Sequence, residues 1–149
     1  MKNYSISVLI PMYNRKNFIK DCIDSVLNQT FQDFEIIIRD DCSIDGVFES
    51  VQENFSAQIS SGKIKLFRNK KNLGEGFNTK KLFESATGKY ITVLHNDDLY
   101  FPNALEYLFE LRKNFQPMLY TAQIFSVRLW TELYRKVRGF SKPVAIIIL

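Results

Sequence analysis

The chain has 149 residues, of which 46 % are apolar and 24 % are charged, and its formal net charge is +4. This length and composition are ordinary for one globular domain with a buried core. The mild positive charge suits an anionic partner such as a nucleotide or a lipid surface. It does not indicate nucleic acid, because the sequence has neither a helix dense in arginine and lysine nor an RNA-binding aromatic motif.

Neither a membrane span nor a secretory signal is indicated. No apolar stretch approaches the ~20 residues of a membrane-spanning helix, and the residues before Pro11 are typical of a strand rather than of a signal peptide. Cys22 and Cys42 lie in neither CxxC nor zinc-site spacing. We therefore expect two free, buried thiols in a reducing compartment, which predicts a cytoplasmic protein.

In chain order, the first half of the sequence alternates short apolar runs with amphipathic stretches. Residues 5–10 predict a strand that Pro11 stops. Apolar residues recur at spacings of three and four over residues 18–27, which predicts a helix, and Asn14 is expected to cap it. A second strand is expected over residues 34–38, followed by a helix over residues 45–58.

The second half continues this alternation. Residues 63–67 predict a third strand, and a polar turn leads to a helix over residues 79–86 with Gly88 as its C-terminal cap. Residues 90–94 predict the fourth strand. Pro102 suits the first turn of another helix, whose inward-facing residues would be Leu105, Leu108 and Leu111.

Strands that alternate with helices at short intervals predict βαβ units and a mainly parallel sheet. The strands are nearly continuous apolar runs, which favours burial on both faces. We therefore expect a single α/β domain over residues 1–149, with three layers. In such sheets, ligands bind outside the carboxyl ends of the strands. Three polar clusters follow predicted strands: residues 11–14 (PMYN), Asp40-Asp41 and Asp97-Asp98.

The Asp97-Asp98 pair indicates a divalent cation. Adjacent carboxylates repel unless a cation or a donor group lies between them, and Mg²⁺ or Mn²⁺ typically binds through one or two carboxylates plus substrate phosphates. Tyr13 could stack on a base, and Asp40 or Asp41 could accept a hydrogen bond from it or from ribose. The alternative is a solvated loop whose acids face water.

Three protein classes place acids at such strand ends. A receiver domain normally has its acid pair after the first strand, where this chain has PMYN. A sugar nucleotidyltransferase needs a glycine-rich phosphate loop there, and PMYNRK contains no glycine. The third class is a transferase that uses a nucleotide-diphosphate sugar.

Four segments support this third class: VLIPMYN, FQDFEIIIRDDCSIDG, NLGEGFNTKKLFESATGKYI and HNDDLYFP. In this order they resemble the P-x-Y-N, D-D-x-S-x-D, N-x-G…A-x-G-x-Y-I and D-x-D-D-x-x-x-P motifs of family 2 glycosyltransferases. The resemblance extends from Ser5 to about Leu111. The resemblance implies that this segment has the GT-A fold and corresponds to the donor-binding half of these enzymes.

Residue by residue, the resemblance implies a nucleotide pocket at the first two clusters and a metal at the third. Asp41 would contact the base, with Asp40 beside it, and uridine is the expected base. Asp97 would be the main ligand of Mn²⁺ or Mg²⁺, with Asp98 in support. The implied donor-nucleotide residues are Pro11, Tyr13, Asn14, Asp40, Asp41 and Asp97.

Two departures from the family motifs affect this site. His95 occupies the place of the first aspartate in the metal motif, where it is either a further metal ligand, a contact to the phosphates, or an ordinary hydrogen-bonded side chain. Residues 78–80 (NTK) stand where the family often has Ala-Arg-Asn. Lys80 or Lys81 would then replace the arginine.

The C-terminal part departs further. FSVRLWTELYRKVRGF resembles a later family helix that arrives early here, so residues 116–149 are expected to form a shortened or truncated acceptor-side region. Basic residues around Phe140 and the apolar VAIIIL predict either peripheral membrane contact at the inner face or a helix and strand packed on the core. These basic residues are Arg135, Lys136, Arg138 and Lys142.

The resemblance implies a metal-dependent, inverting glycosyltransferase of polysaccharide biosynthesis, with a UDP-sugar as donor. The acceptor, whether a sugar, a lipid-linked glycan or a protein, is not indicated. Inversion needs a base at the acceptor hydroxyl, and no aspartate or glutamate follows Glu132. The catalytic residue therefore stays unassigned, with Glu132 and Asp45 as the first to examine. The alternative is a non-catalytic nucleotide-sugar binder or a decayed transferase.

Overall fold

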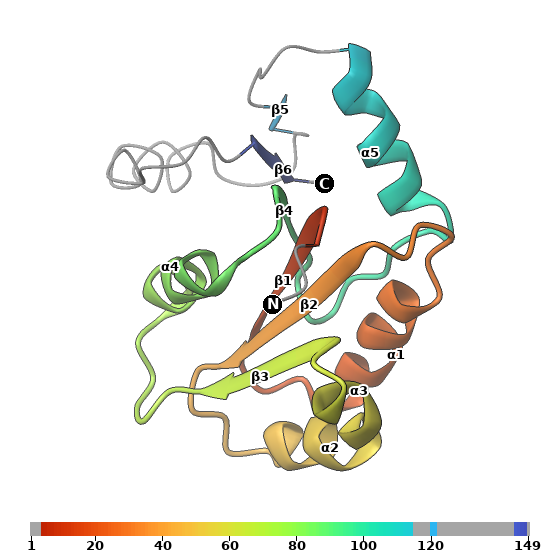
Figure 1. The fold of residues 1–149 in the computed structure, drawn as a ribbon. Coiled ribbons are helices and arrows are strands. Elements are labelled where there is room, and N and C mark those ends of the chain that lie inside the picture. Colours follow the sequence, from red (N-terminus) through yellow and green to blue (C-terminus); the bar gives the residue numbers. More distant parts are fainter. Residues whose placement is uncertain (1–3, 115–119, 122–144, 149) are drawn as a thin grey trace.

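The computed structural model describes residues 4–114, 120–121 and 145–148. In these residues, parallel strands form one sheet in the order β3-β2-β1-β4-β6-β5 (Figure 1). The strands are β1 (Ile6–Met12), β2 (Phe34–Asp40), β3 (Ile64–Arg68), β4 (Tyr90–Val93), β5 (Tyr120–Thr121) and β6 (Ala145–Ile148). The helices are α1 (Lys16–Leu27), α2 (Val47–Asn54), α3 (Ser56–Ser60), α4 (Glu75–Ser85) and α5 (Ala104–Asn114).

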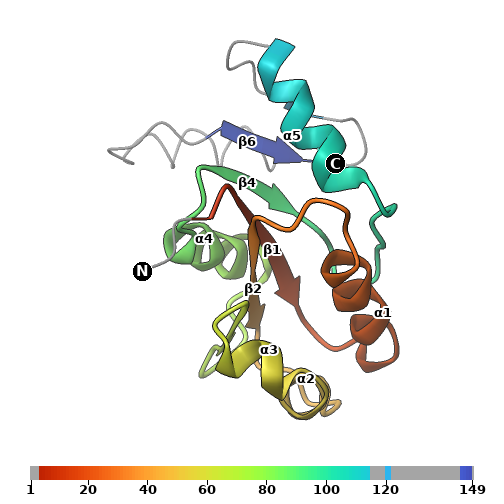
Figure 2. The same cartoon turned by 45° about the vertical axis from the view of Figure 1, so that its right-hand side comes forward.

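The sheet is the middle of three layers, as the alternation of strands and helices predicts. Helix α4 covers one face, and α1, α2 and α5 cover the other (Figures 1 and 2). The α4 side buries Leu9, Ile37, Leu82, Phe83, Ile91 and Val93. The larger core on the opposite side includes Ile19, Ile23 and Val26 of α1, together with Leu105 and Leu108 of α5. The inward placement predicted for these two leucines is confirmed, whereas the Leu111 side chain lies outside the described residues.

Strand β1 continues through Pro11 to Met12, so the prediction that the proline stops it is wrong. Leu94 donates its N–H to the carbonyl of Leu9, and Asp41 donates to the carbonyl of Met12. Along β1, the backbone N–H and C=O groups of successive residues therefore point to β4 and to β2 in turn. Pro11 shares the β4 side with Leu9, but the pairing with β4 ends at Leu9. Pro11 lies opposite Arg39 of β2, but in the described residues the side that its missing N–H would face has no paired strand, so the proline is tolerated.

The single helix expected over residues 45–58 is two helices, α2 and α3. Phe55 separates them because its backbone leaves the helical region, with φ −120° and ψ 25°. Its side chain is only 4 % exposed and belongs to the core. Helix α4 begins at Glu75, earlier than the predicted residue 79.

Gly88 is not the C-terminal cap of α4, which is Ala86. Gly88 instead packs against β1: its N–H donates to the Ser7 hydroxyl at 2.8 Å, and a Cβ there would lie 2.6 Å from the Ser7 nitrogen. Glycine is therefore required by the close approach of two backbones rather than by a helix end.

The apolar tail belongs to the sheet. Ala145 and Ile146 of β6 pair with Tyr90 and Ile91 of β4, which agrees with the packed alternative for this segment. Residues 125–140, which resemble the later family helix, lie outside the described residues, as do the four basic residues around Phe140. Among the helices of the described part, none is long and apolar enough to span a membrane.

Candidate functional site

The three polar clusters meet at the carboxyl edge of the sheet, as the topology predicts. Asn14 joins them: its N–H donates to the Ser43 hydroxyl at 2.7 Å, and its Oδ1 accepts from the Ile44 N–H at 3.3 Å. Its carbonyl accepts from Asn96 Nδ2 at 3.2 Å. The loops after β1, β2 and β4 are thereby held as one surface, which we call the rim.

The rim requires an unusual backbone at Asn14 and Arg15, with φ values of 56° and 70°. Such left-handed residues cost roughly 1–2 kcal/mol each, which the bonds around Asn14 offset. Asn14 does not cap α1, so that prediction is wrong. Asp45 caps it instead: its Oδ2 accepts from the Lys16 N–H at 2.9 Å, while its Oδ1 accepts from the Val47 N–H at 3.1 Å.

Pro11 is buried at the base of the rim, whereas Tyr13 is 49 % exposed. The Tyr13 ring therefore stands in solvent beside Asn14, at the end of the central strand. An exposed aromatic ring in this position has a free face on which a planar base can stack.

Asp40 is fully buried and shapes the loop after β2. Its Oδ1 accepts from both the N–H and the hydroxyl of Ser43. Its Oδ2 forms an ion pair with Arg68 Nε at 3.1 Å. Burial raises the pKa of Asp40 although these partners oppose the rise. Both oxygens are therefore used inside the protein.

Asp41 holds the segment between β3 and α4 against the rim. Its Oδ1 accepts from Asn69 Nδ2 at 2.8 Å and from the Leu73 N–H at 2.9 Å. Its Oδ2 accepts from the Gly74 N–H at 2.8 Å. Asp41 is 2 % exposed, and the described residues fill three of the about four acceptor positions of its carboxylate, which leaves one on Oδ2. Its contact to a base stays a prediction.

Asp97 and Asp98 lie in the turn after β4, which the Asp98 N–H closes by donating to the His95 carbonyl at 3.0 Å. Asp97 Oδ2 lies 3.8 Å from an Arg15 guanidinium nitrogen, and both side chains are largely exposed. Behind them, Cys22 is buried. Burial raises the pKa of its thiol to about 12, and the negative charges of Asp98 and Asp97 add to the rise.

His95 is also exposed, and its Nδ1 lies 3.9 Å from Glu75 Oε1 at the start of α4. Lys80 and Lys81 lie on the solvent side of α4, and Lys80 pairs with Glu84 at 3.9 Å. The buried side of the helix carries Asn78, which donates to the Arg39 carbonyl at 3.0 Å.

The donor set of the rim fits a hard divalent cation in part. Asp97 and Asp98 supply accessible carboxylate oxygens, which Mg²⁺ and Mn²⁺ prefer. In the described part of the chain, no group of three or more His, Cys, Asp or Glu residues could hold a metal ion. An ion at this turn would therefore take its remaining oxygens from the bound ligand and from water.

Sequence reasoning did not single out Arg15 or Glu75, and it named Asp45 only as a carboxylate to examine for the missing base. Arg15 directly follows the PMYN cluster, which is a local signal. Asp45 and Glu75 act on Lys16 and His95, which lie far from them in the sequence. No local pattern could have shown those contacts.

Comparison with known proteins agrees with the four motifs. Residues 7–144 match the model of the family described as glycosyl transferase family 2. An uncharacterized glycosyltransferase of Rickettsia bellii is 38 % identical over 106 residues, which cover 71 % of this chain and 15 % of the relative. The UDP-Glc:alpha-D-GlcNAc-diphosphoundecaprenol beta-1,3-glucosyltransferase WfgD of Escherichia coli is 33 % identical over 106 residues, or 71 % of this chain and 40 % of WfgD. The chain thus spans less than half the length of these relatives.

Solved structures show the same fold. S. aureus TarS 1-349 in complex with UDP-GlcNAc superposes with a TM-score of 0.66 at 24 % identity, covering 74 % of this chain and 31 % of TarS. The mannosyltransferase PcManGT from Pyrobaculum calidifontis, in complex with GDP-Man and Mn²⁺, has a TM-score of 0.59 at 20 % identity, covering 66 % and 29 %. The sheet order, the rim and these matches lead to one conclusion: the chain belongs to glycosyltransferase family 2 and has its GT-A fold.

Proposed function

We propose that this chain binds a nucleotide-diphosphate sugar, with a UDP-sugar favoured, and supplies the donor half of a glycosyltransferase. The observation that carries the proposal is the rim. Asn14 ties together the loops that bear Tyr13, Asp41 and Asp97, so a base-stacking ring, a base acceptor and a metal-binding carboxylate share one surface. The complexes of TarS with UDP and with UDP-GlcNAc support the choice of uridine.

The nucleoside would lie over Pro11 and against the Tyr13 ring. Asp41 would accept one hydrogen bond from a base N–H with the position left on Oδ2. The three internal donors fix the direction of this carboxylate, so a base without a matching N–H would leave the acceptor unpaired and bind more weakly. Asp40 would contribute indirectly, because it holds the loop that carries Asp41.

The diphosphate would face Asp97 and Asp98, which would hold Mn²⁺ or Mg²⁺ together with phosphate oxygens. When bound, such a cation neutralises the charge of a leaving diphosphate. His95 would lie beside the two carboxylates, where it would be a further metal ligand or a contact to the phosphates. Glu75 would orient its ring. In the absence of a cation, Arg15 supplies the nearest positive charge to Asp97.

The transfer step needs a base that this rim does not offer. Asp40 and Asp45 use both oxygens within the protein, and a metal-bound carboxylate is a poor base because the cation lowers its proton affinity. Glu132 lies outside the described residues. We therefore propose that the chain binds its donor but transfers sugar slowly, and that transfer, where it occurs, inverts the anomeric centre.

The acceptor and the cellular setting of the reaction are proposed from one relative and from the cysteines. WfgD is named for a lipid-diphosphate acceptor, and a lipid-linked glycan is a fitting acceptor for this chain too. Cys22 and Cys42 are free, which suits the cytoplasmic side of a membrane. Polysaccharide biosynthesis would follow from such an acceptor.

Release of UDP from a set of UDP-sugars, with and without lipid-linked and free sugar acceptors, tests the transfer half of the proposal. We expect slow, acceptor-independent hydrolysis, because water is small and the donor site is intact. Acceptor-stimulated turnover near ~10 s⁻¹, an ordinary enzyme rate, would show that a base is present in the chain. Glu132→Gln would then be the first variant to measure, with Asp45→Asn as the matched carboxylate at the rim.

A further inference from the structure

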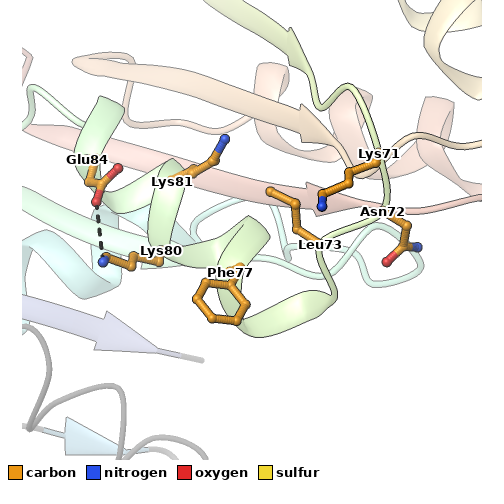
Figure 3. Close-up of a pocket in the computed structure, with 7 residues that line it drawn as sticks. All are labelled: Lys71, Asn72, Leu73, Phe77, Lys80, Lys81 and Glu84. Atoms are coloured by element: carbon orange, nitrogen blue, oxygen red, sulfur yellow. Dashed lines mark ion pairs between the residues drawn. The ribbon is translucent and has the colours of Figure 1, made fainter.

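A depression of about 400 Å³ lies between α4 and the segment that precedes it (Figure 3). Lys71, Asn72 and Leu73 form one wall, and residues of α4 form the other. The side chains from α4 are Phe77, Lys80, Lys81 and Glu84. We call this feature the α4 depression. It is not part of the proposed donor site, whose residues lie on the loops after β1, β2 and β4.

The α4 depression has an excess of positive charge that the fold does not use. Its lining holds three lysines and one glutamate, and the pair between Lys80 and Glu84 spans 3.9 Å with both side chains half exposed. Such a surface pair contributes little to stability. Among the described residues, Lys71 and Lys81 form no ion pair or hydrogen bond through their ammonium groups. The charge therefore remains available for an anionic partner.

An aromatic side chain stands among these charges. Phe77 is 65 % exposed, although α4 already packs on the sheet through Leu82 and Phe83. Its ring is therefore not needed for the core. A soluble polyanion would make use of the lysines alone, whereas the interface of a lipid bilayer accommodates both an apolar ring and cationic side chains.

We propose that the α4 depression docks this chain onto a membrane surface that carries anionic phospholipid headgroups. Lys71, Lys80 and Lys81 would contact headgroup phosphates, and Phe77 would enter the boundary between headgroups and acyl chains. The wall formed by residues 71–73 adjoins the donor site, because the N–H groups of Leu73 and Gly74 donate to Asp41.

Co-sedimentation with vesicles tests this surface. The full chain is mixed with vesicles of phosphatidylcholine alone or of equal parts phosphatidylcholine and phosphatidylglycerol. We expect binding only to the anionic vesicles. Replacing Lys71 and Lys81 by glutamine should weaken it about 30-fold, on the basis of roughly one kcal/mol per lysine near an anionic surface.

The matched control removes two exposed lysines elsewhere, Lys20 on α1 and Lys89 before β4, and should bind almost as the unaltered chain does. Phe77→Ser should weaken vesicle binding while binding to soluble polyphosphate is unchanged. Circular dichroism checks that each variant is folded. Equal binding to the two vesicle types, or equal losses in the two double-lysine variants, would overturn the proposal. Full binding by Phe77→Ser would indicate a polyanion site instead.

Discussion

Carboxylates lie at both ends of β2 and at the carboxyl end of β4, and Glu35 near the amino end differs from the acids that follow β4. At the amino end, Glu35 Oε1 accepts from the Ser7 hydroxyl and from the N–H and hydroxyl of Thr87, and Oε2 pairs with Lys65 Nζ at 2.7 Å. At the carboxyl end, Asp97 has only the distant Arg15, and Asp98 has no side-chain partner among the described residues.

This difference separates acids that stabilise the fold from the acids that we propose to bind a ligand. Burial opposes ionisation of Glu35, yet Lys65, Ser7 and Thr87 together lower its pKa, so the charge is stabilised by the protein itself. Asp97 and Asp98 are exposed and adjacent, and among the described residues only Arg15 opposes their mutual repulsion, which is why we propose that they bind a cation. A carboxylate whose partners are complete supports the fold, and one whose partners are missing points to a ligand.

The largest expected effect is on stability at the amino end. Glu35→Ala leaves the Ser7 and Thr87 donors without their acceptor and removes the partner of Lys65. Unfolding in urea should show a loss of about 3 kcal/mol. Glu53→Ala, a change of an exposed glutamate on α2, is the control and should stay within about 0.5 kcal/mol. An equally small loss for Glu35→Ala would show that this network is dispensable.

Asp41 stands between the two kinds of acid, because it has three internal donors and one free acceptor position. Asp41→Ala should lower stability by roughly 1–3 kcal/mol, since it leaves the Leu73 and Gly74 N–H groups unpaired. It should also flatten the preference for UDP over GDP and ADP. Calorimetry with the three nucleotides measures this, and a variant that keeps the full preference for UDP would remove Asp41 from the base pocket.

Asp97→Asn should leave stability almost unchanged but weaken UDP binding in Mn²⁺ by at least about tenfold, or ~1.4 kcal/mol. The amide keeps the shape of the side chain and removes the charge that a cation requires. Glu53→Gln on α2 is a suitable control, because Glu53 is exposed and lies near the end of α2 that is farther along the chain from the rim loop after β2. The same affinity in Asp97→Asn and in the unaltered chain would contradict the metal assignment.

The smallest effect is a pH dependence. Because the folded pKa of Glu35 is lowered from 4.5, its contribution to stability is present above that pH and is lost as the pH falls through the folded value. The unfolding free energies of the unaltered chain and of Glu35→Gln should therefore converge below pH 4.5. A difference that stays constant down to strongly acidic pH would exclude Glu35 as the titrating group.

Much of the fold and part of the rim were predictable from the sequence. The apolar runs of β1 and β2 and the spacing in α1 predicted the sheet and its larger core, and the polar residues after the strands predicted the rim. The place of Glu35 was not predictable, because FEIII does not show that Ser7 and Thr87 will meet that glutamate. The same holds for Asp45, which replaced Asn14 as the cap of α1, and for β6, whose pairing with β4 depends on contacts distant in sequence.

The most direct test of the rim is isothermal titration of UDP into the unaltered chain, with Mn²⁺ and again with EDTA. GDP and ADP are titrated under the same conditions. We predict that UDP binds in Mn²⁺, that EDTA weakens this binding by at least about tenfold, and that GDP and ADP bind more weakly than UDP. Equal affinity for the three nucleotides, or an affinity for UDP that EDTA leaves unchanged, would contradict the claim that this rim is a metal-dependent uridine-diphosphate site.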